Sequence, residues 1–495
     1  MLNVPHDLYT AEQTRELERI ATEQHNLSFS ELMTRAGASA LATIKQHWPR
    51  AERILILCGT GNNGGDGFEL ARQAAAYDYR VMILQLGDEK SLTKTASAAK
   101  DALLATGIEI HRFQEKLPST DVVVDAIFGT GLNRAIEGEA SAVIDAINLT
   151  KRSPVLSLDI PSGLHADNGN VLGTAVNATM TLNFIGLNTG LFTGDGPNHC
   201  GKVQFDSLDT PPAVYNHFPP VARRVSLEKE ADQLAPRERT GHKGLYGHLL
   251  IIGGDVGMSG AVRLAAEAGA RVGAGLTSIA TRSAHSALLN QTRPELMCHG
   301  VEAPDELDPL LNTANALVIG PGLGQSDWAK GLFQKAINTK LPLVVDADAL
   351  NLLSQNTQHH KHWVLTPHPG EAARLLNCTS VDIQADRFNA VQELQNIYGG
   401  IVVLKGAGTL IHNGEKPIHL STAGNPGMSS GGMGDVLAGV IGSLIAQGFS
   451  LMDAASIGVT LHGMAGDKAA KQNGERGMLA MDLMPHLRHL ANLIY

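Results

Sequence analysis

Two amphipathic patterns open the chain, and both predict helices. Residues 10–24, TAEQTRELERIATEQ, repeat apolar positions at helical spacing, and Thr10 and Gln13 stand in the arrangement of a capping box. Residues 28–48, SFSELMTRAGASALATIKQHW, continue with the same periodicity. We therefore expect two helices before the first strand.

Short apolar runs then alternate with helical patterns in two series, which predicts βαβ units and largely parallel sheets with function at the carboxyl ends of the strands. Between the series, residues 206–224 carry four prolines and no strong periodicity, which is typical of a linker. The first series is RILILCG (53–59), YRVMILQLG (79–87), DVVVDAIFG (121–129), PVLSLDIPSG (154–163) and ATMTLNFIG (178–186). The second is GHLLIIGGD (247–255), AGLTSIATR (274–282), NALVIGPGLG (315–324), LPLVVDADAL (341–350), HWVLTPHPGE (362–371) and GIVVLKGAGTLI (400–411).

Composition narrows the classes of partner. A chain of 495 residues is too long for one core, so two α/β domains are expected. The net charge of −10, the 4% aromatic content and the absence of a Lys/Arg run disfavour nucleic acid and membrane partners and favour small molecules. The four cysteines form no CxxC pair, and the N-terminus has no signal pattern, so we expect a cytoplasmic protein. α/β domains of this kind are compatible with a homo-oligomeric state.

The first glycine-rich turn, GTGNNGGDG (59–67), follows a strand pattern and precedes a helical one. Gly59, Gly61 and Gly64 have the spacing of the dinucleotide-binding fingerprint, in which helix amides receive a phosphate. That fingerprint does not account for Asn62, Asn63 and Asp66. Polar groups within a phosphate turn indicate a pocket that holds something besides a pyrophosphate.

Two carboxylates end neighbouring strand patterns of the first series. Asp125 and Asp159 face the same edge of a parallel sheet as the glycine-rich turn, and Ser162 follows just beyond. Carboxylate, carboxamide and hydroxyl oxygens suit a hard, weakly charged cation. Each Asp alone reads more readily as the cap of a turn, but their occurrence together with GTGNNGGDG favours a site.

The second half carries another glycine-rich loop, NPGMSSGGMGDVLAG (425–439). Gly431, Gly432 and Gly434 precede Asp435 and a helix, so bare amides can hold an anion while the Asp takes a proton from an attacking hydroxyl. A flexible loop with Asp435 as helix cap is the plain alternative. No GxxxxGK[ST] sequence occurs, which disfavours a P-loop NTPase.

Nearby segments favour the functional interpretation of that loop. Lys405 stands in a glycine-rich turn between strands, and His368 stands in the proline-stiffened turn TPHPGE (366–371). Asp346 and Asp348 read as structural or supporting groups. GPGLG (320–324) could be an ordinary strand-to-helix turn.

As a set, the motifs resemble known families. GTGNNGGDG, DAIFGTGLNR (125–134) and LDIPSGL (158–164) resemble the NAD(P)H-hydrate epimerases over residues 10–215. HKGLYGHLLIIGG (242–254), GPGLG, TPHPGE, KGAGT (405–409) and the 425–439 loop resemble the ADP/ATP-dependent NAD(P)H-hydrate dehydratases, relatives of the ribokinase-like kinases, over residues 229–495. In this order the two halves resemble the bifunctional NAD(P)H-hydrate repair family.

The resemblance implies a fold and two activities. It implies a Rossmann-like three-layer sandwich over residues 1–216, a linker over 217–228 and a ribokinase-like α/β domain over 229–495. The first domain would interconvert R- and S-NAD(P)HX, and the second would dehydrate the S form by phosphorylation and phosphate elimination. We expect ADP rather than ATP as phosphoryl donor, because the bifunctional layout resembles that of members that use ADP.

The resemblance also implies site residues. Asp159 would transfer protons in the epimerase, Asp435 would be the base of the dehydratase, and Mg²⁺ would act with the nucleotide. Potassium would be held by Asn63, Asp125 and Ser162. The epimerase substrate would be bound by Asn62, Asn63, Gly64, Gly65, Asp66, Gly129, Thr130, Gly131, Leu132, Asn133, Arg134 and Asp159, and the dehydratase substrate by Ala261, Gly322, His368 and Asp435. The nucleotide would be bound by Lys405, Gly406, Ala407, Gly408, Thr409, Asn425, Pro426, Gly427, Met428, Ser429, Ser430, Gly431, Gly432, Met433 and Gly434.

Two other interpretations remain open from the sequence. A sugar or vitamin-precursor kinase with a nucleotide-sensing N-terminal domain would have the same anion hole and base, but it would release a stable phosphorylated product. Alternatively, residues 1–215 could be a binding module without catalysis. Such a module would not need Asn63, Asp125, Asp159 and Ser162 together.

Overall fold

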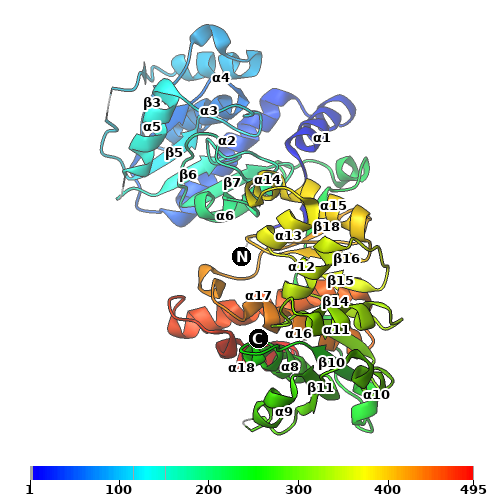
Figure 1. Cartoon of the computed structure of the whole chain (residues 1–495). Coiled ribbons are helices and arrows are strands. Elements are labelled where there is room, and N and C mark those ends of the chain that lie inside the picture. Colours follow the sequence, from blue (N-terminus) through cyan, green and yellow to red (C-terminus); the bar gives the residue numbers. More distant parts are fainter. Residues whose placement is uncertain (1–3, 115, 151, 292, 494–495) are drawn as a thin grey trace. The chain divides into compact units, whose positions relative to one another are not determined.

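A computed structural model describes residues 4–114, 116–150, 152–291 and 293–493 (Figure 1). By its internal contacts the chain divides after Arg223 into two compact units. The segment 217–228, predicted as a linker, spans this division. The outer limits of the predicted domains, residues 1 and 495, lie outside the described residues.

Unit 1 is built on a sheet in the order β4-β3-β2-β5-β6-β7-β8, and every neighbouring pair runs parallel. All five strands of the first predicted series are present, and β4 and β8 are additions. Thr10 and Ser28 are the N-caps of helices α1 and α2, each with a complete capping box. The elements are β1 (Asp7–Leu8), α1 (Ala11–Gln24), α2 (Phe29–His47), β2 (Arg53–Cys58), α3 (Asn62–Ala76), β3 (Arg80–Gln85), α4 (Lys94–Leu104), β4 (Ile110–His111), β5 (Val122–Ala126), α5 (Gly138–Asn148), β6 (Val155–Leu158), β7 (Met180–Phe184), α6 (Gly196–His199), β8 (Lys202–Asp206) and β9 (Ala222–Arg224).

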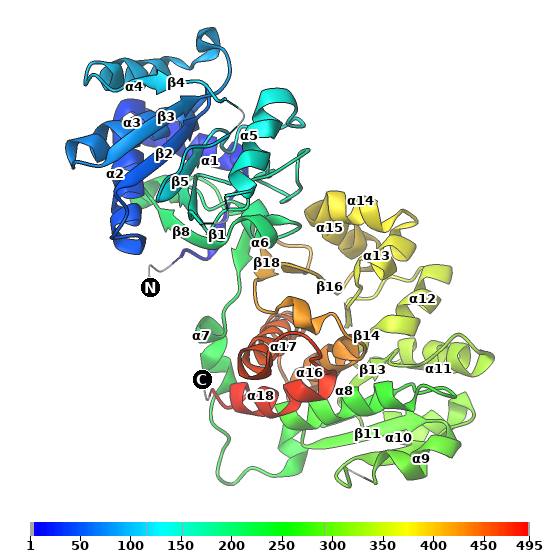
Figure 2. The same cartoon turned by 90° about the vertical axis from the view of Figure 1, so that its left-hand side faces the viewer.

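Alternating side chains of this sheet enter two cores. Ile54 and Ile56 of β2 join the core formed with α1 to α4, whereas Leu55 and Leu57 face the core formed with α5. Figure 2 shows the sheet between α2 and α3 on one side and α5 on the other. The predicted three-layer α/β sandwich is therefore confirmed.

The proline-rich segment after β8 is more ordered than its sequence predicts. Val214 is fully buried in the core of unit 1, and the Tyr215 hydroxyl donates to the Ile185 carbonyl at 2.8 Å. Farther on, Ala222 pairs antiparallel with Leu8 of β1. Apolar contacts from distant parts of the chain thus supply the order that local periodicity lacks.

Unit 2 contains the second sheet, in the order β18-β17-β16-β15-β14-β13-β10-β11-β12. Its pairs are parallel from β16 to β12, whereas β17 pairs antiparallel with both β16 and β18. The elements are α7 (Leu227–Glu230), β10 (His248–Ile252), α8 (Ser259–Val272), β11 (Leu276–Thr281), α9 (Ser283–Leu289), β12 (Met297–Gly300), α10 (Asp308–Leu311), β13 (Ala316–Ile319), α11 (Asp327–Ile337), β14 (Leu343–Val345), α12 (Ala347–Gln355), β15 (Trp363–Leu365), α13 (Pro369–Leu376), α14 (Ser380–Ala385), α15 (Arg387–Tyr398), β16 (Ile401–Leu404), β17 (Thr409–His412), β18 (Ile418–Ser421), α16 (Met433–Ala446), α17 (Leu451–Asn473) and α18 (Leu483–Leu490).

Helix α16 lies at the centre of unit 2. Its residues Val436, Val440 and Leu444 are fully buried in the core that joins one face of the sheet to α8, α17 and α18. Figure 2 shows α11, α12 and α13 on the other side of this sheet. The central helix follows directly after the glycine-rich loop singled out in the sequence, and Met433 and Val436 of its first turn are buried. None of the helices in the described ranges combines the length and apolarity needed to cross a bilayer.

Candidate active sites

The glycines of the glycine-rich turn at residues 59–67 have different structural roles. A Cβ atom on Gly59 would lie 1.9 Å from the Ile127 carbonyl oxygen, and one on Gly64 would lie 2.1 Å from the Gly59 carbonyl oxygen. These two glycines allow α3 to pack closely on the strands. Gly61, the N-cap of α3, has open space where its Cβ would be. The turn therefore leaves a free backbone surface at a helix N-terminus, where a phosphate could bind.

Asp125 and Ser162 come together as a buried oxygen-rich cluster, and Asn63 of α3 is also buried. The Ser162 hydroxyl and amide donate to the Asp125 carboxylate at 2.5 and 2.9 Å, and Asp125 is fully buried. Neither polar atom of the buried Asn63 side chain has a hydrogen-bond partner among the described residues. Burial raises the pKa of Asp125, although the hydrogen bonds from Ser162 oppose this shift. A buried carboxylate with hydroxyl partners and a buried amide oxygen that lacks a partner are both groups that fit a monovalent cation.

Asp159 has a strained backbone and a fixed side chain. Its φ of 63° lies in the left-handed region, which is rare for a non-glycine residue. The Thr130 amide donates to its carboxylate at 2.9 Å, and the Asn183 amide donates at 3.3 Å. Burial raises the pKa of Asp159, against the effect of the Thr130 hydrogen bonds. A raised pKa is what a carboxyl group needs for proton transfer near neutral pH.

A pocket of about 430 Å³ collects most of the predicted epimerase residues. Gly64 and Gly65 are not among its lining residues, because both are packed inside unit 1: a Cβ on Gly65 would lie 2.4 Å from Met33 Cε. The predicted residues that do line the pocket are Asn62, Asn63, Asp66, Gly129, Thr130, Gly131, Leu132, Asn133, Arg134 and Asp159.

Sequence motifs missed the helical wall of this pocket. Arg15 and Glu18 of α1 and Phe29 and Met33 of α2 line it. These residues belong to ordinary amphipathic helices, and no short motif marks them. Only the packing of both helices against the sheet brings them to the glycine-rich turn.

In unit 2, Asp435 stands in the first turn of α16, behind an amide-rich loop. Gly432 caps the helix with a φ of 89°, and Gly431 has open space where a Cβ would be. Burial and the negative charge of Asp346 raise the pKa of Asp435 to about 7, while Lys405 acts in the opposite direction. The arrangement combines an anion-binding helix end with a carboxylate suited to accept a proton.

The Lys405 ammonium lies in a carboxylate cluster. Its Nζ is 2.9 Å from Asp346 Oδ1 and 3.6 Å from Glu371 Oε2. Asp346 is almost completely buried and also accepts a hydrogen bond from the Thr366 hydroxyl at 2.7 Å. Asp346 thus positions the Lys405 ammonium and raises the pKa of Asp435. The sequence alone did not decide this role of Asp346.

Residues predicted around the dehydratase substrate fall on separate elements. His368 is the N-cap of α13, where its Nδ1 accepts from the Gly370 amide at 3.0 Å and its Nε2 lies 3.3 Å from Glu371 Oε1. A Cβ on Gly322 would lie 2.6 Å from the Met258 carbonyl oxygen and 3.1 Å from the Ala261 Cβ. Gly322 and Ala261 are therefore neighbours, and Glu371 joins His368 to the Lys405 cluster.

The two segments predicted to bind the nucleotide are both braced by side chains that the motifs did not include. Buried Arg387 donates to the carbonyls of Lys405 and Gly408 at 3.3 Å, which supports the 405–409 turn. Asp467 accepts from the Asn425 side chain at 2.9 Å and from the Gly424 amide at 3.0 Å. Both braces support backbone of the segments that the sequence predicts as nucleotide-binding.

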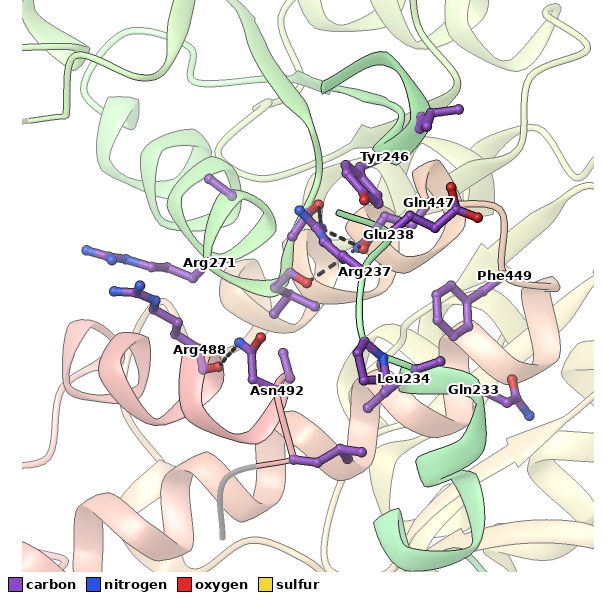
Figure 3. A pocket seen from close by; sticks show the side chains of 18 residues that line it. Gln233, Leu234, Arg237, Glu238, Tyr246, Arg271, Gln447, Phe449, Arg488 and Asn492 are labelled. Atoms are coloured by element: carbon purple, nitrogen blue, oxygen red, sulfur yellow. Dashed lines mark hydrogen bonds between the residues drawn. The ribbon is translucent and has the colours of Figure 1, made fainter. Parts of the chain in front are cut away.

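A cavity of about 720 Å³ in unit 2 has none of the predicted site residues among its lining residues. Its Arg237 lies over the Tyr246 ring, 3.8 Å from the centroid, and donates to the Gln447 side chain. Figure 3 shows Arg271 and Arg488 side by side at one end of this cavity. Arg237 is therefore engaged in bracing the chain before β10.

Comparisons with known proteins match both halves of the chain. A family model described as NAD(P)H-hydrate dehydratase matches residues 249–488, and one described as YjeF-related protein N-terminus matches residues 30–190. The bifunctional NAD(P)H-hydrate repair enzyme Nnr of Coxiella burnetii is 48% identical over 98% of this chain and 99% of its own length. The corresponding Escherichia coli protein is 44% identical over 99% of this chain and 95% of its own length.

Among solved structures, the ADP/ATP-dependent NAD(P)H-hydrate dehydratase of Bacillus subtilis, co-crystallised with ATP and Mg²⁺, is 26% identical. It covers 55% of this chain and 98% of its own, with a TM-score of 0.50. A hypothetical protein from Streptococcus mutans covers the same share at 30% identity and a TM-score of 0.51. Together with the full-length relatives, these matches establish that the chain belongs to the family of bifunctional NAD(P)H-hydrate repair enzymes.

Proposed function

We propose that this chain repairs hydrated NADH and NADPH with two active sites. Unit 1 interconverts the R and S epimers of the hydrate, and unit 2 converts the S epimer to NAD(P)H with ADP as phosphoryl donor. The observation that carries this proposal is similarity to bifunctional repair enzymes along nearly the whole chain. The chemistry of the two clusters is consistent with it.

In unit 2, Asp435 accepts the proton of the substrate hydroxyl. The hydroxyl oxygen then forms a bond to the terminal phosphorus of ADP, and AMP leaves as the bond between the two phosphates breaks. Loss of the new phosphate with its electron pair, and of a proton from the adjacent ring carbon, restores the double bond of the reduced nicotinamide. The first-turn amides of α16 receive the negative charge of the transferred group.

Magnesium fits this site as a cation that enters with the nucleotide. The carboxylates of Asp346, Glu371 and Asp435 act on the Lys405 ammonium, and Asp348 acts on Asp435, so carboxylates outnumber this ammonium. In the described ranges no group of three His, Cys, Asp or Glu residues is arranged to hold a metal by itself. Mg²⁺ typically binds through one or two carboxylates plus substrate phosphates, and it would neutralise charge during phosphoryl transfer.

In unit 1, Asn63, Asp125 and Ser162 would hold potassium beside the pocket. The unpartnered Asn63 amide and the buried Asp125 carboxylate support this assignment. The cation would compensate the Asp125 charge and orient the Phe128–Arg134 loop, whose Phe128 amide donates to the Ser162 hydroxyl at 2.8 Å. Asp159 would then transfer protons at the hydroxyl-bearing ring carbon.

The test uses the full-length protein with hydrated NADH that contains both epimers, together with potassium and Mg²⁺. ADP and ATP are supplied in separate reactions, and the near-ultraviolet absorbance of reduced nicotinamide is followed. We expect both epimers to be recovered with ADP. Recovery of only one epimer would contradict the epimerase assignment, and a stable phosphorylated product without recovery would indicate a kinase instead.

A further inference from the structure

Helix α1 brings a carboxyl group to the epimerase pocket that no sequence motif marks. Glu18 lines the pocket together with Asp66 and Asp159. Within the described part of the chain, no hydrogen bond or ion pair engages the Glu18 carboxyl group. It is therefore available to a molecule in the pocket.

Helix α1 is fixed to the rest of unit 1 at its N-terminal end. The Ala11 amide donates to the Asp167 carboxylate at 2.6 Å, and the Thr14 hydroxyl donates to the Gly186 carbonyl at 3.3 Å. Thr14 is buried, and Glu18 follows it by four residues on the same face of the helix. The position of Glu18 is thus set by packing and not by a mobile surface turn.

A chain of hydrogen bonds links this helix face to Asp159. The side-chain amide of Asn188 donates to the Thr14 hydroxyl at 3.3 Å, and the side-chain amide of Asn183 donates to Asn188 Oδ1 at 2.9 Å. The same Asn183 amide also donates to the Asp159 side chain at 3.3 Å. All three hydrogen bonds are buried or partly buried. They therefore fix the position of α1 relative to Asp159.

We propose that Glu18 is the second acid–base group of the epimerase site, acting as the partner of Asp159. This inference rests on the epimerase function proposed above. In this proposal, Glu18 donates a proton to the substrate when Asp159 accepts one. In the reverse direction, Glu18 accepts a proton when Asp159 donates one.

Inversion of the hydrate needs two such groups. Hydration places a hydroxyl on a ring carbon next to the nitrogen. One carboxylic acid protonates this hydroxyl, and the carbon–oxygen bond breaks with its electron pair going to oxygen, so that water leaves. The nitrogen lone pair forms a carbon–nitrogen double bond. Water then adds to the other face of the carbon and gives its extra proton to the second carboxylate, so that one proton has passed from the first carboxyl to the second.

The charges around Glu18 favour a shared proton. Burial and the negative charge of Asp159 raise the pKa of Glu18 to about 7, and Arg15 on the same helix partly opposes this. Burial, Asp159 and Glu18 likewise raise the pKa of Asp66 on α3. Among the described residues that line the pocket, Arg134 is the other charged one. Carboxyl groups confined together cannot all ionise near neutral pH, so the site retains a proton for the first step.

The test compares Glu18→Gln with Glu16→Gln in the full-length enzyme. Glu16 lies on the same helix but is exposed and paired with Arg19, so its change should leave epimerisation as in the wild type. Glu18→Gln preserves the size of the side chain but cannot exchange protons. We expect kcat for epimerisation to fall by about 10²–10⁴-fold, the usual range for a general acid–base group. Dehydration of pure S epimer by the same preparation should be unchanged, which normalises the amount of enzyme, and an unchanged unfolding transition of unit 1 controls for folding.

The pH profile separates catalysis from a structural role. The wild type should give a bell-shaped kcat profile, because one proton must be present and a second absent. Residual activity of Glu18→Gln should lose one limb of the bell, and Glu18→Asp should restore a bell with reduced height. A wild type that epimerises, with Glu18→Gln retaining its rate or its bell-shaped profile, would overturn the inference. A wild type that does not epimerise would instead refute the proposed function.

Discussion

At the scale of single residues, both candidate sites depend on carboxyl groups whose surroundings shift their pKa values upward. Asp159 is held by Thr130 and Asn183 in unit 1, and Asp435 in unit 2 feels the opposing charges of Asp346 and Lys405. Burial disfavours the charged form of each carboxyl. The same burial that costs stability therefore adapts these groups to proton transfer near neutral pH.

Replacement of Asp435 by Asn should abolish dehydration and leave epimerisation intact. The amide cannot accept the hydroxyl proton, so we expect kcat/KM of the dehydratase to fall by about 10²–10⁴-fold. In the wild type, the base must be deprotonated, so the rate should fall about tenfold per pH unit below the pKa of about 7 and level off above it. Steady-state rates from pH 5 to 9 measure both effects.

Asp327→Asn is the matched control for this change. Asp327 also stands in the first turn of a helix, α11, but its side chain is fully exposed. A comparable loss in this variant, or a wild-type rate that does not change across pH 7, would contradict the role of Asp435.

The proposed potassium site of Asn63, Asp125 and Ser162 makes a separate prediction at this scale. Replacement of potassium by choline should lower the epimerase rate, because the Asp125 charge would lose its counter-ion. Asn63→Ala removes an unpartnered amide oxygen, so we expect the potassium concentration for half-maximal activity to rise by about 10–100-fold, the range known for groups that support a metal site. An epimerase rate in Asn63→Ala with the wild-type potassium response would refute the assignment.

At the scale of elements, the sites depend on helices that approach their neighbours unusually closely. In unit 2, α16 packs on α8, and a Cβ on Gly439 would lie 1.9 Å from the Ala265 carbonyl oxygen. The backbone has little freedom to yield there, because both helices are buried in the same core. This contact sets the position of the first turn that carries Asp435.

Gly439→Ala should therefore destabilise unit 2, whereas Gly260→Ala in α8 should not. Overpacking a core position costs about 1–3 kcal/mol, and a contact through backbone belongs at the upper end of that range. A Cβ on Gly260 meets nothing within 4 Å, so the higher helix propensity of alanine should stabilise the unit by up to about 1 kcal/mol. Denaturant unfolding followed by dehydratase activity distinguishes the two. Equal stabilities of the two variants would show that α16 can shift away from α8.

At the scale of the whole molecule, the two units carry independent chemistry in one chain. Each unit has its own core and its own sheet, and each candidate site lies at the carboxyl ends of parallel strands within a single unit. Epimerisation lets the stereospecific second site consume both forms of the damaged cofactor. A fused chain provides the two activities in equal amounts.

Two variants that each lack one of the two activities should therefore complement each other. Asp159→Asn alone should recover only the S epimer rapidly, and Asp435→Asn alone should recover neither. An equimolar mixture of the two should recover both epimers to the same final absorbance as the wild type, because the hydrate can diffuse from one chain to another. Recovery that remains at the level of Asp159→Asn would mean that the hydrate must pass between sites of the same chain.

The sequence by itself determined the fold class, the division into two α/β units, the capped helices and the glycine-rich turns. These features depend on local periodicity, capping and backbone sterics, which a short stretch of chain expresses. Local pattern failed for residues 206–224, where Val214 and Tyr215 are ordered by contacts with distant segments. The strands β4, β8, β12 and β18 were not predicted either, and β4 has only two residues.

Only the tertiary structure decided which predicted residues share a site and which surroundings they have. It joined Asp125 to Ser162, left the Asn63 amide unpartnered, and placed Gly64 and Gly65 in packing rather than along the pocket. It also brought Glu18 to Asp66 and Asp159, and Lys405 to Asp346. The physical reason is that burial and electrostatic coupling act through space between residues far apart along the chain. A pattern of residue types can therefore propose a carboxylate, but its pKa and its partner are properties of the folded molecule.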